Sequence, residues 1–119
     1  MTATTTKPLG NYLHIHRKKA GLTQREIGSL IGYLEEGAIS RHERSHSFPP
    51  LLAALAYEAI FGVPIGDIFS GLRELVASGV EQRINELEER LERATNQDRH
   101  ASAVTRRKLA WINERRVAR

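Results

Sequence analysis

The sequence predicts an all-α fold made of five short helices, a long helix and a basic C-terminal helix. Apolar residues recur at spacings of three and four along most of the 119 residues, which is the period of an amphipathic helix. Glycines and prolines interrupt this pattern at intervals suited to short helices. We find no strand signal, that is, no run of alternating apolar and polar residues. A chain of this length is expected to form one compact domain with a modest core, plus an appendage.

The composition indicates the cellular compartment and excludes some classes of protein. The sequence holds no cysteine, which excludes a disulfide framework or a thiolate metal site and suits a reducing cytoplasm. No apolar run approaches the ~18 residues of a membrane span, and the first eight residues, MTATTTKP, lack a hydrophobic signal core. We therefore expect a soluble, cytoplasmic protein without a membrane partner, whose residues 1–8 form a disordered tail.

The net charge of +4 is distributed unevenly. Residues 1–46 carry seven Lys/Arg and four Asp/Glu, a net +3, and residues 96–119 carry seven and two, a net +5. Residues 47–95 between them carry four and eight, a net −4. Basic ends favour contact with a polyanion such as nucleic acid, whereas the acidic middle is best explained as the solvated face of charged helices.

The first two helices are predicted from the signals at their ends. Residues 9–20 form a helical pattern that Gly21 ends, because glycine readily adopts the left-handed conformation of a helix stop. Thr23 and Glu26 form a capping box, in which each side chain satisfies a backbone amide of the first turn. The helix that this box opens is expected over residues 24–31.

The next helical pattern, residues 36–44, has an outer face suited to reading DNA. Its one large aliphatic residue, Ile39, must point inward. The residues left facing outward are Glu36, Gly37, Ser40, Arg41 and Arg44. Two helices joined by a tight turn, the second with a small, polar and arginine-bearing face, are what entry into the major groove requires.

The stretch from Gly21 to Glu43 resembles the phage-repressor (Cro/Xre-type) helix-turn-helix family. The family pattern is roughly GLTQxELAxxLG, a turn and then ISRxER, and this chain has GLTQREIGSLIG followed by ISRHER. Pro49 and the FGVP run at residues 61–64 also stand where the family has them, so the resemblance covers about residues 9–70. One departure is the segment 32–39, which is one residue longer than the commonest family turn.

The resemblance implies roles for particular residues. It implies a helix-turn-helix DNA-binding domain over residues 9–70, with a structural ion pair between Arg17 and Glu43. Gln24 would lie over the DNA backbone, where the helix-end amides also favour a phosphate, and Arg25 beside it adds charge. Ser40 and Arg41 occupy the outward positions, and an arginine there can bind guanine O6 and N7 or grip a phosphate.

Two acidic residues near the start of this predicted helix, Glu35 and Glu36, admit two interpretations. A carboxylate near a groove wall repels phosphate, and the base group it can bind is the N4 amino group of cytosine. Acidic residues at a helix start are also favoured by the helix dipole, which makes capping the simpler explanation. The sequence leaves both open.

Two further helices complete the domain. Residues 51–61, which follow Pro49-Pro50, are apolar nearly all round, so we expect them to form the central core helix. A short helix is predicted over residues 65–69.

Beyond residue 70 the pattern becomes that of a long helix over residues 72–94, part of a helical extension spanning residues 71–119. Its apolar residues stand at spacings of four and three, and those predicted to form a dimer or partner seam are Val80, Ile84, Leu87 and Leu91. With Ile84 at heptad position a and Leu87 at d, a parallel dimer is favoured, in which Arg83 and Glu88 of opposite chains attract. The alternative is that the stripe folds back onto its own domain or onto the last helix.

The last helix is predicted over residues 103–117, after a break at 96–102. Its apolar residues imply a packing partner, either the long helix or another subunit. Its basic residues are Arg106, Arg107, Lys108, Arg115 and Arg116. They suit a second DNA contact, an acidic protein partner or solubility alone, and the sequence does not choose among these.

These observations favour binding over catalysis. There is no cysteine nucleophile, GxSxG motif or phosphate-cradling glycine loop, so no catalytic residue is predicted. The histidines lack a third partner at ligand spacing, so neither a metal nor another cofactor is expected. The leading hypothesis is a sequence-specific double-stranded DNA-binding transcriptional regulator that binds a near-palindromic operator as a homodimer. The alternative is a protein-interaction module, of antitoxin or anti-repressor type, on the same scaffold with weak or lost DNA reading.

Overall fold

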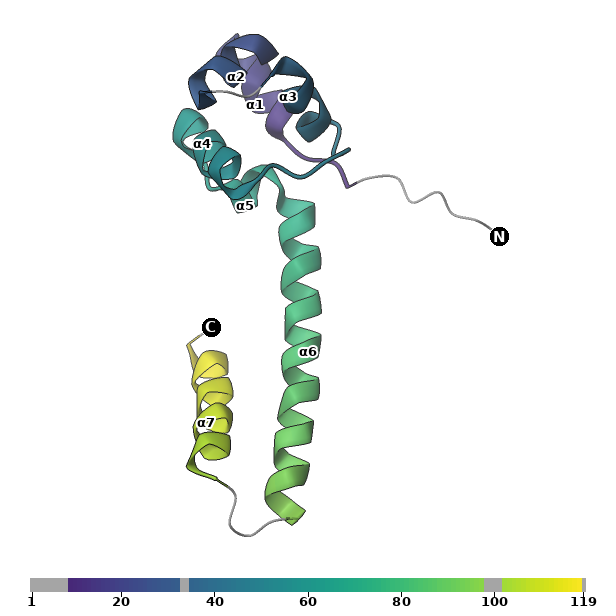
Figure 1. The fold of residues 1–119 in the computed structure, drawn as a ribbon, viewed down its shortest axis with the longest axis vertical. Helices are drawn as coiled ribbons and strands as arrows, with labels where there is room; N and C mark the ends of the chain where they lie inside the picture. The colour runs from purple at the N-terminus through teal and green to yellow at the C-terminus, as the bar shows by residue number, and fades with distance from the viewer. Residues whose placement is uncertain (1–8, 33–34, 98–101, 119) are drawn as a thin grey trace, which may run out of the picture. The chain divides into compact units, whose positions relative to one another are not determined.

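A computed structural model describes residues 9–32, 35–97 and 102–118, and within these the chain forms seven helices and no strand. The predicted all-α class is thus confirmed for the described residues, as are a long helix and a C-terminal helix after it (Figure 1). The helices are α1 (Leu13–Ala20), α2 (Gln24–Ile31), α3 (Glu36–Glu43), α4 (Leu51–Phe61), α5 (Ile65–Ile68), α6 (Ser70–Gln97) and α7 (Ala103–Val117). The bounds of α2, α4 and α7 are those predicted from the sequence. The predicted tail, residues 1–8, lies outside the described residues.

The start of α1 differs from the prediction, which began this helix at residue 9. The helix begins at Leu13, whose backbone N–H donates to Asn11 Oδ1 at 3.0 Å. The N–H of Tyr12 donates to the carbonyl oxygen of Ile68 at 2.8 Å. A tertiary hydrogen bond therefore holds the chain before α1 in a non-helical path, which local spacing does not reveal.

The ends of α1 and α2 follow the local signals. Gly21 has the left-handed conformation, with φ of 73°, and ends α1. The capping box is present: the N–H of Glu26 donates to Thr23 Oγ1 at 3.0 Å, and the N–H of Thr23 donates to Glu26 Oε1 at 2.9 Å. These two predictions are confirmed.

The chain divides into two compact units between Leu75 and Val76, a boundary that falls inside α6. The first unit contains α1 to α5 and the start of α6. Its buried core takes side chains from α1, α2, α3, α4, α5 and the residue after α5; they are Leu13, Ile27, Ile39, Tyr57, Ile68 and Phe69. The core therefore ties all the short helices together, α3 included.

The fourth helix does not lie at the centre of this core as predicted. Within α4, all of which the structure describes, Ala53 and Tyr57 are the buried residues. Leu51, Leu52 and Leu55 are 75%, 77% and 53% exposed. The prediction was wrong because it assumed that neighbours would cover an all-round apolar helix, whereas one side of α4 faces the core.

In the second unit α7 runs back beside α6 (Figure 1). Five residues, 98–102, connect the two helices, and short connections of this kind join antiparallel neighbours. Ile84 of α6 and Ile112 of α7 are buried, at 9% and 0% exposure. Arg115 forms an ion pair with Glu81, and other polar contacts join Arg116 to Glu88 at 2.6 Å and to Asn85 at 2.9 Å. Of the predicted seam, Ile84 is thus buried within a single chain, while Val80 is exposed and Leu87 and Leu91 are half-buried.

A histidine–tyrosine pair lies within the first unit. His42 of α3 is 3% exposed, and its Nδ1 lies 2.7 Å from the hydroxyl oxygen of Tyr57 on α4. The two rings meet edge to face at 5.8 Å. Burial, and to a lesser degree the charge of Arg41, lowers the pKa of His42 below its ordinary value of 6.5. Burial in the folded chain therefore favours the neutral form of His42.

None of the helices in the described part of the chain is both long and apolar enough to cross a membrane.

Lowering the pH from about 7 to about 5 is expected to destabilise the fold through His42. Because the pKa of His42 is lower in the folded chain, the unfolded chain binds a proton at this histidine more readily as the pH falls below 6.5, so the free energy of unfolding decreases. His42→Gln, which cannot titrate, should lose less stability over this interval, as measured by urea denaturation at a series of pH values. The exposed His46→Gln serves as the control and should keep the wild-type dependence. An equal loss in wild type and His42→Gln would exclude the role of His42.

Candidate nucleic-acid interface

The outer face of α3 is built from the residues that the sequence predicted. Ile39 and His42 point inward, at 0% and 3% exposure. Among the outward residues, Glu36, Arg41 and Arg44 are exposed, and Gly37 and Ser40 are half-buried. Spacings of three and four residues connect each of the five to others on the same side of the helix, so they form one surface.

The two arginines of this face lie along the helix. A Cβ placed on Gly37 would lie 3.5 Å from Nη1 of Arg41, so that guanidinium rests over the glycine one turn earlier. Arg44 Nε donates a long hydrogen bond, 3.4 Å, to the backbone carbonyl of Ser40. Both guanidinium groups are thus near the helix surface with their remaining donors open to solvent, which is the chemistry that phosphates and guanine edges accept.

The two acidic residues stand at the start of α3 and are both exposed. The backbone carbonyl of Glu35 accepts from the N–H of Ala38 at 3.0 Å and of Ile39 at 3.4 Å. Its side chain makes no capping hydrogen bond within the described residues. The exposed carboxylates of Glu35 and Glu36 lie at the end of α3 where the helix dipole favours a negative charge. The lengthened turn of the prediction includes residues 33–34, which lie outside the described residues.

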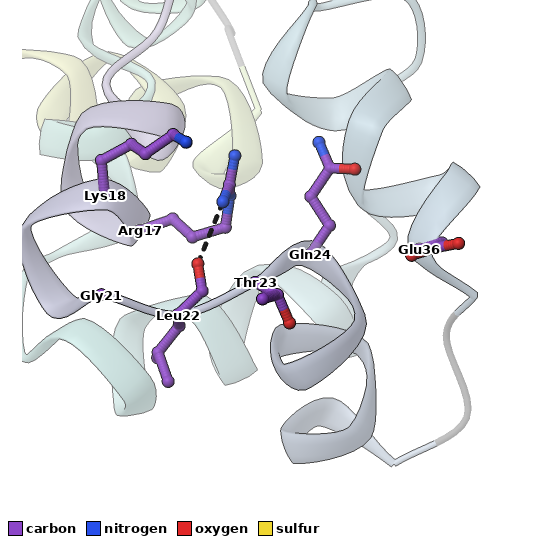
Figure 2. Close-up of a pocket in the computed structure, with 7 residues that line it drawn as sticks. All are labelled: Arg17, Lys18, Gly21, Leu22, Thr23, Gln24 and Glu36. Atoms are coloured by element: carbon purple, nitrogen blue, oxygen red, sulfur yellow. Dashed lines mark hydrogen bonds between the residues drawn. The ribbon is translucent and has the colours of Figure 1, made fainter.

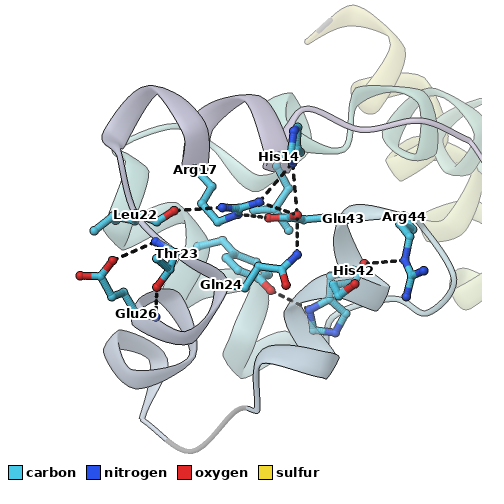
Figure 3. A network of polar contacts seen from close by, with 12 residues as sticks. His14, Arg17, Leu22, Thr23, Gln24, Glu26, His42, Glu43 and Arg44 are labelled. Atoms are coloured by element: carbon cyan, nitrogen blue, oxygen red, sulfur yellow. Dashed lines mark hydrogen bonds and ion pairs between the residues drawn. The ribbon is translucent and has the colours of Figure 1, made fainter.

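An ion pair holds α3 against α1, and Figure 3 shows the surrounding network. Arg17 donates to Glu43 through Nε, and through Nη2 at 3.2 Å, so the pair is bidentate. Its Nη1 donates to the backbone carbonyl of Leu22 at 3.0 Å. The side chains of Arg17 and Glu43 are 8% and 5% exposed. One guanidinium therefore connects α1, the turn before α2, and α3, in the pairing that the family resemblance implies.

Gln24 belongs to the same network. Its side-chain amide Nε2 donates to Glu43 Oε1 at 3.0 Å, and Gln24 is half-buried. His14 Nδ1 lies 3.4 Å from the same oxygen. The predicted phosphate contact of Gln24 would have to coexist with this hydrogen bond, whereas Arg25 beside it is exposed.

The network lowers the pKa of Glu43. Burial by itself raises this pKa, but the hydrogen bonds from Arg17 and Gln24, the charge of Arg17 and the contact with His14 together outweigh it. The carboxylate is therefore ionised and satisfied in the folded state. It contributes stability above its ordinary pKa of 4.5, and that contribution is lost as the pH falls through the lower folded value.

Asn11 is a site-positioning residue that the sequence did not single out. Its side-chain amide donates to the carbonyl oxygens of His42 and Glu43, at 2.9 and 3.4 Å, and to Ser45 Oγ at 2.8 Å. Ser45 follows α3 with a positive φ of 57°. Asn11 thus satisfies carbonyls at the end of α3, and no local sequence signal links two residues so far apart in the chain.

A shallow open depression of about 510 Å³ lies beside this network (Figure 2). Its rim includes Lys18 at the end of α1, Thr23 before α2 and Glu36 at the start of α3. Lys18 is exposed and can meet an anion there, while Glu36 opposes one on the other side. The depression therefore extends the surface of α3 toward the start of α2, with its positive charge on the α1 side.

Metal binding has no counterpart among the described residues, where no group of three or more His, Cys, Asp or Glu side chains is arranged to hold an ion. The chain matches none of the protein-family models, curated proteins or solved structures with which it was compared.

Removing the buried arginine is expected to destabilise the first unit strongly. Arg17→Met leaves the buried carboxylate of Glu43 without its main partner, and such a change costs about 3–5 kcal/mol of unfolding free energy. Lys18→Met, at the exposed neighbouring position, should change it by no more than about 0.5 kcal/mol. Urea denaturation followed by circular dichroism measures both.

The double variant Arg17→Met/Glu43→Leu tests the cause. It removes the unpaired charge together with its partner and should recover part of the loss. Equal stability of Arg17→Met and Lys18→Met would show that the ion pair does not hold α3 in place.

Proposed function

We propose that this chain is a sequence-specific double-stranded DNA-binding transcriptional regulator that places α3 in the major groove. On this proposal α2 and α3 form a helix-turn-helix of the phage-repressor (Cro/Xre) type, within a five-helix domain over about residues 9–70. Two copies would bind a near-palindromic operator, with their α3 helices about 34 Å apart in successive major grooves. The observation that carries the proposal is the outer face of α3, which is polar, bears two arginines and is fixed from behind by buried contacts.

The contacts that hold α3 in place support recognition of specific bases rather than nonspecific attraction to DNA. A recognition helix must hold its side chains in register with base edges, because a displaced hydrogen-bond donor loses its partner. Here α3 is held by Ile39 in the core, by His42 against Tyr57 and by Glu43 against Arg17. Asn11 holds its end.

The outward residues then divide into two roles. Arg41, near the middle of the face, can bind guanine O6 and N7, and Ser40 can donate to or accept from a base edge. Arg44 at the helix end, Arg25 on α2 and Lys18 on α1 suit phosphates, which supply affinity and register but not sequence choice. Glu35 and Glu36, being exposed with no capping bond among the described residues, are available to the N4 donor of cytosine.

A second candidate function is a protein-interaction module on the same scaffold. Exposed leucines on α4 and exposed carboxylates at the start of α3 favour it, because protein partners bury apolar surface and DNA repels carboxylates. Under this alternative the arginines of α3 are surface charges without a base to read.

Selection of bound duplexes from a random DNA pool, followed by affinity measurements over a salt series, tests the proposal. We expect an enriched near-palindromic motif, with log affinity falling linearly as log salt rises because phosphate contacts release counterions. Weak, unselective binding that vanishes near physiological salt would contradict it.

Arg41→Ala separates base reading from general attraction. It is expected to weaken binding to the selected motif by about 1–3 kcal/mol and to relax the preference at one base pair. Arg25→Ala, which removes a phosphate contact, should instead weaken binding uniformly and reduce the salt slope by about one.

Arg93→Ala, at an exposed arginine of α6, serves as the charge-matched control and should change neither preference nor slope. If Arg41→Ala behaves like Arg93→Ala, α3 does not read bases. Circular dichroism of each variant checks whether the fold is kept.

A further inference from the structure

The first unit carries a large exposed apolar surface on α4 and the loop before it. Phe48, Leu51, Leu52 and Leu55 are 66%, 75%, 77% and 53% exposed, and we call these four residues the apolar α4 surface. Leu55 lies four residues after Leu51 and three after Leu52, and residues at these spacings are neighbours on a helix surface, so the three leucines share one side of α4. Scattered exposed leucines are common, but four large apolar side chains close together mark an interaction site.

The apolar α4 surface lies within a stretch of the chain that contains no charged residue. Residues 45–57 contain no Lys, Arg, Asp or Glu, although charged residues make up 27% of the whole protein. The charged residues that flank this stretch are Arg44 and Glu58, and Glu58 Oε1 accepts a hydrogen bond from the N–H of Ile65 at 2.6 Å. The gap in charge therefore coincides with the apolar α4 surface.

A groove of about 190 Å³ lies beside Phe48. Leu9, Phe69, Leu72 and Leu75 line it together with Phe48, so its walls are mainly apolar. A space of this size admits an aliphatic or aromatic side chain of a partner. When two copies pack about a two-fold axis, an exposed ring of each copy can enter the apolar groove of the other.

We propose that a second copy of this chain covers the apolar α4 surface, so that the two copies pack through α4 and Phe48 about a two-fold axis. In such an interface each residue meets its own counterpart or that of a neighbour, so a surface of one charge sign would repel its copy. An uncharged surface meets no such penalty, which favours a second copy over a partner recognised by charge.

The chain distance between this surface and α3 agrees with the proposal, which here rests on the proposed function. The eight residues of α3 span about 12 Å, so its centre lies about 6 Å from its end. Phe48 follows Glu43 by five residues, a reach of at most about 18 Å. The centre of α3 therefore lies within about 24 Å of Phe48, and an axis through the surface can lie at half of 34 Å from each α3.

The seam predicted from the sequence is less available to a second copy. Ile84 is buried beside α7 of its own chain, and Arg115 and Arg116 bind carboxylates on either side of it. A parallel α6 dimer through Ile84 would have to displace α7. The apolar α4 surface needs no such rearrangement.

Sedimentation velocity of the full chain over a concentration series tests the proposal. The wild-type chain is expected to be dimeric at micromolar concentration, and Leu52→Glu should raise the dimer dissociation constant at least about tenfold, because two carboxylates then lie in an apolar interface. Leu52 is 77% exposed, so this substitution is expected to leave the core intact, which circular dichroism of the variant checks.

Two matched variants carry the same change elsewhere. Both Leu30→Glu and Trp111→Glu should remain dimeric. Leu30 on α2 is 59% exposed and Trp111 on α7 is 50% exposed. A dimer that survives Leu52→Glu overturns the proposal. So does dissociation by Trp111→Glu alone, which would assign the interface to the helical extension, and so does a wild-type chain that stays monomeric with and without DNA.

The failure of this inference is distinguishable from failure of the proposed function. A chain that selects a specific motif but does not dimerise through Leu52 keeps the function and loses the interface. If Leu52→Glu dissociates the dimer but the wild-type chain selects no DNA motif, the proposed interface is supported and the proposed function is contradicted.

Discussion

The ion pair between Arg17 and Glu43 is the contact on which the first unit most depends. Both side chains are nearly excluded from water, and a buried charge is tolerated only when its hydrogen-bonding capacity is met. Arg17 donates hydrogen bonds to the carboxylate of Glu43 and to the backbone carbonyl of Leu22. Glu43 also accepts a hydrogen bond from the side-chain amide of Gln24. A single guanidinium thus joins α1, the turn before α2, and α3. The orientation of the outer face of α3 follows from this geometry.

The anchoring of α3 is largely polar, and this has consequences for how the helix behaves. Eight residues are too few for a helix to persist alone in water, so tertiary contacts must supply its stability. Ile39 supplies the apolar contact, but His42, Glu43 and the cap from Asn11 fix its rotation and position through directional hydrogen bonds. Directional hydrogen bonds stabilise one position and rotation of the helix over similar alternatives. These contacts also make the helix sensitive to acid. The folded chain favours neutral His42 and ionised Glu43, and protonation at low pH changes both side chains.

The second unit shows the limit of heptad reasoning. The spacing of the apolar residues on α6 correctly indicates that one side of the helix needs a partner, since Ile84 is buried. It does not say whether the partner is another chain or a later helix of the same one. In the structure the partner is α7 of the same chain, which five residues connect to α6, and a tethered segment competes with a second copy at a high effective concentration. The Arg115 and Arg116 contacts use basic residues whose role the sequence left open.

The sequence alone determined the elements whose signals are local. The capping box at Thr23, the stop at Gly21 and the bounds of α2, α4 and α7 depend on residues within one or two helical turns, so their chemistry can be read from a short stretch of sequence. The outward face of α3 was predictable because one aliphatic residue among polar ones fixes which side is buried. The tertiary structure alone decided what depends on distant residues meeting: the start of α1, the Asn11 cap, the burial of His42 against Tyr57 and the exposure of the α4 leucines. The physical reason is that burial and long-range hydrogen bonds are properties of neighbours in space, and helical periodicity shows where a face is apolar without showing what covers it.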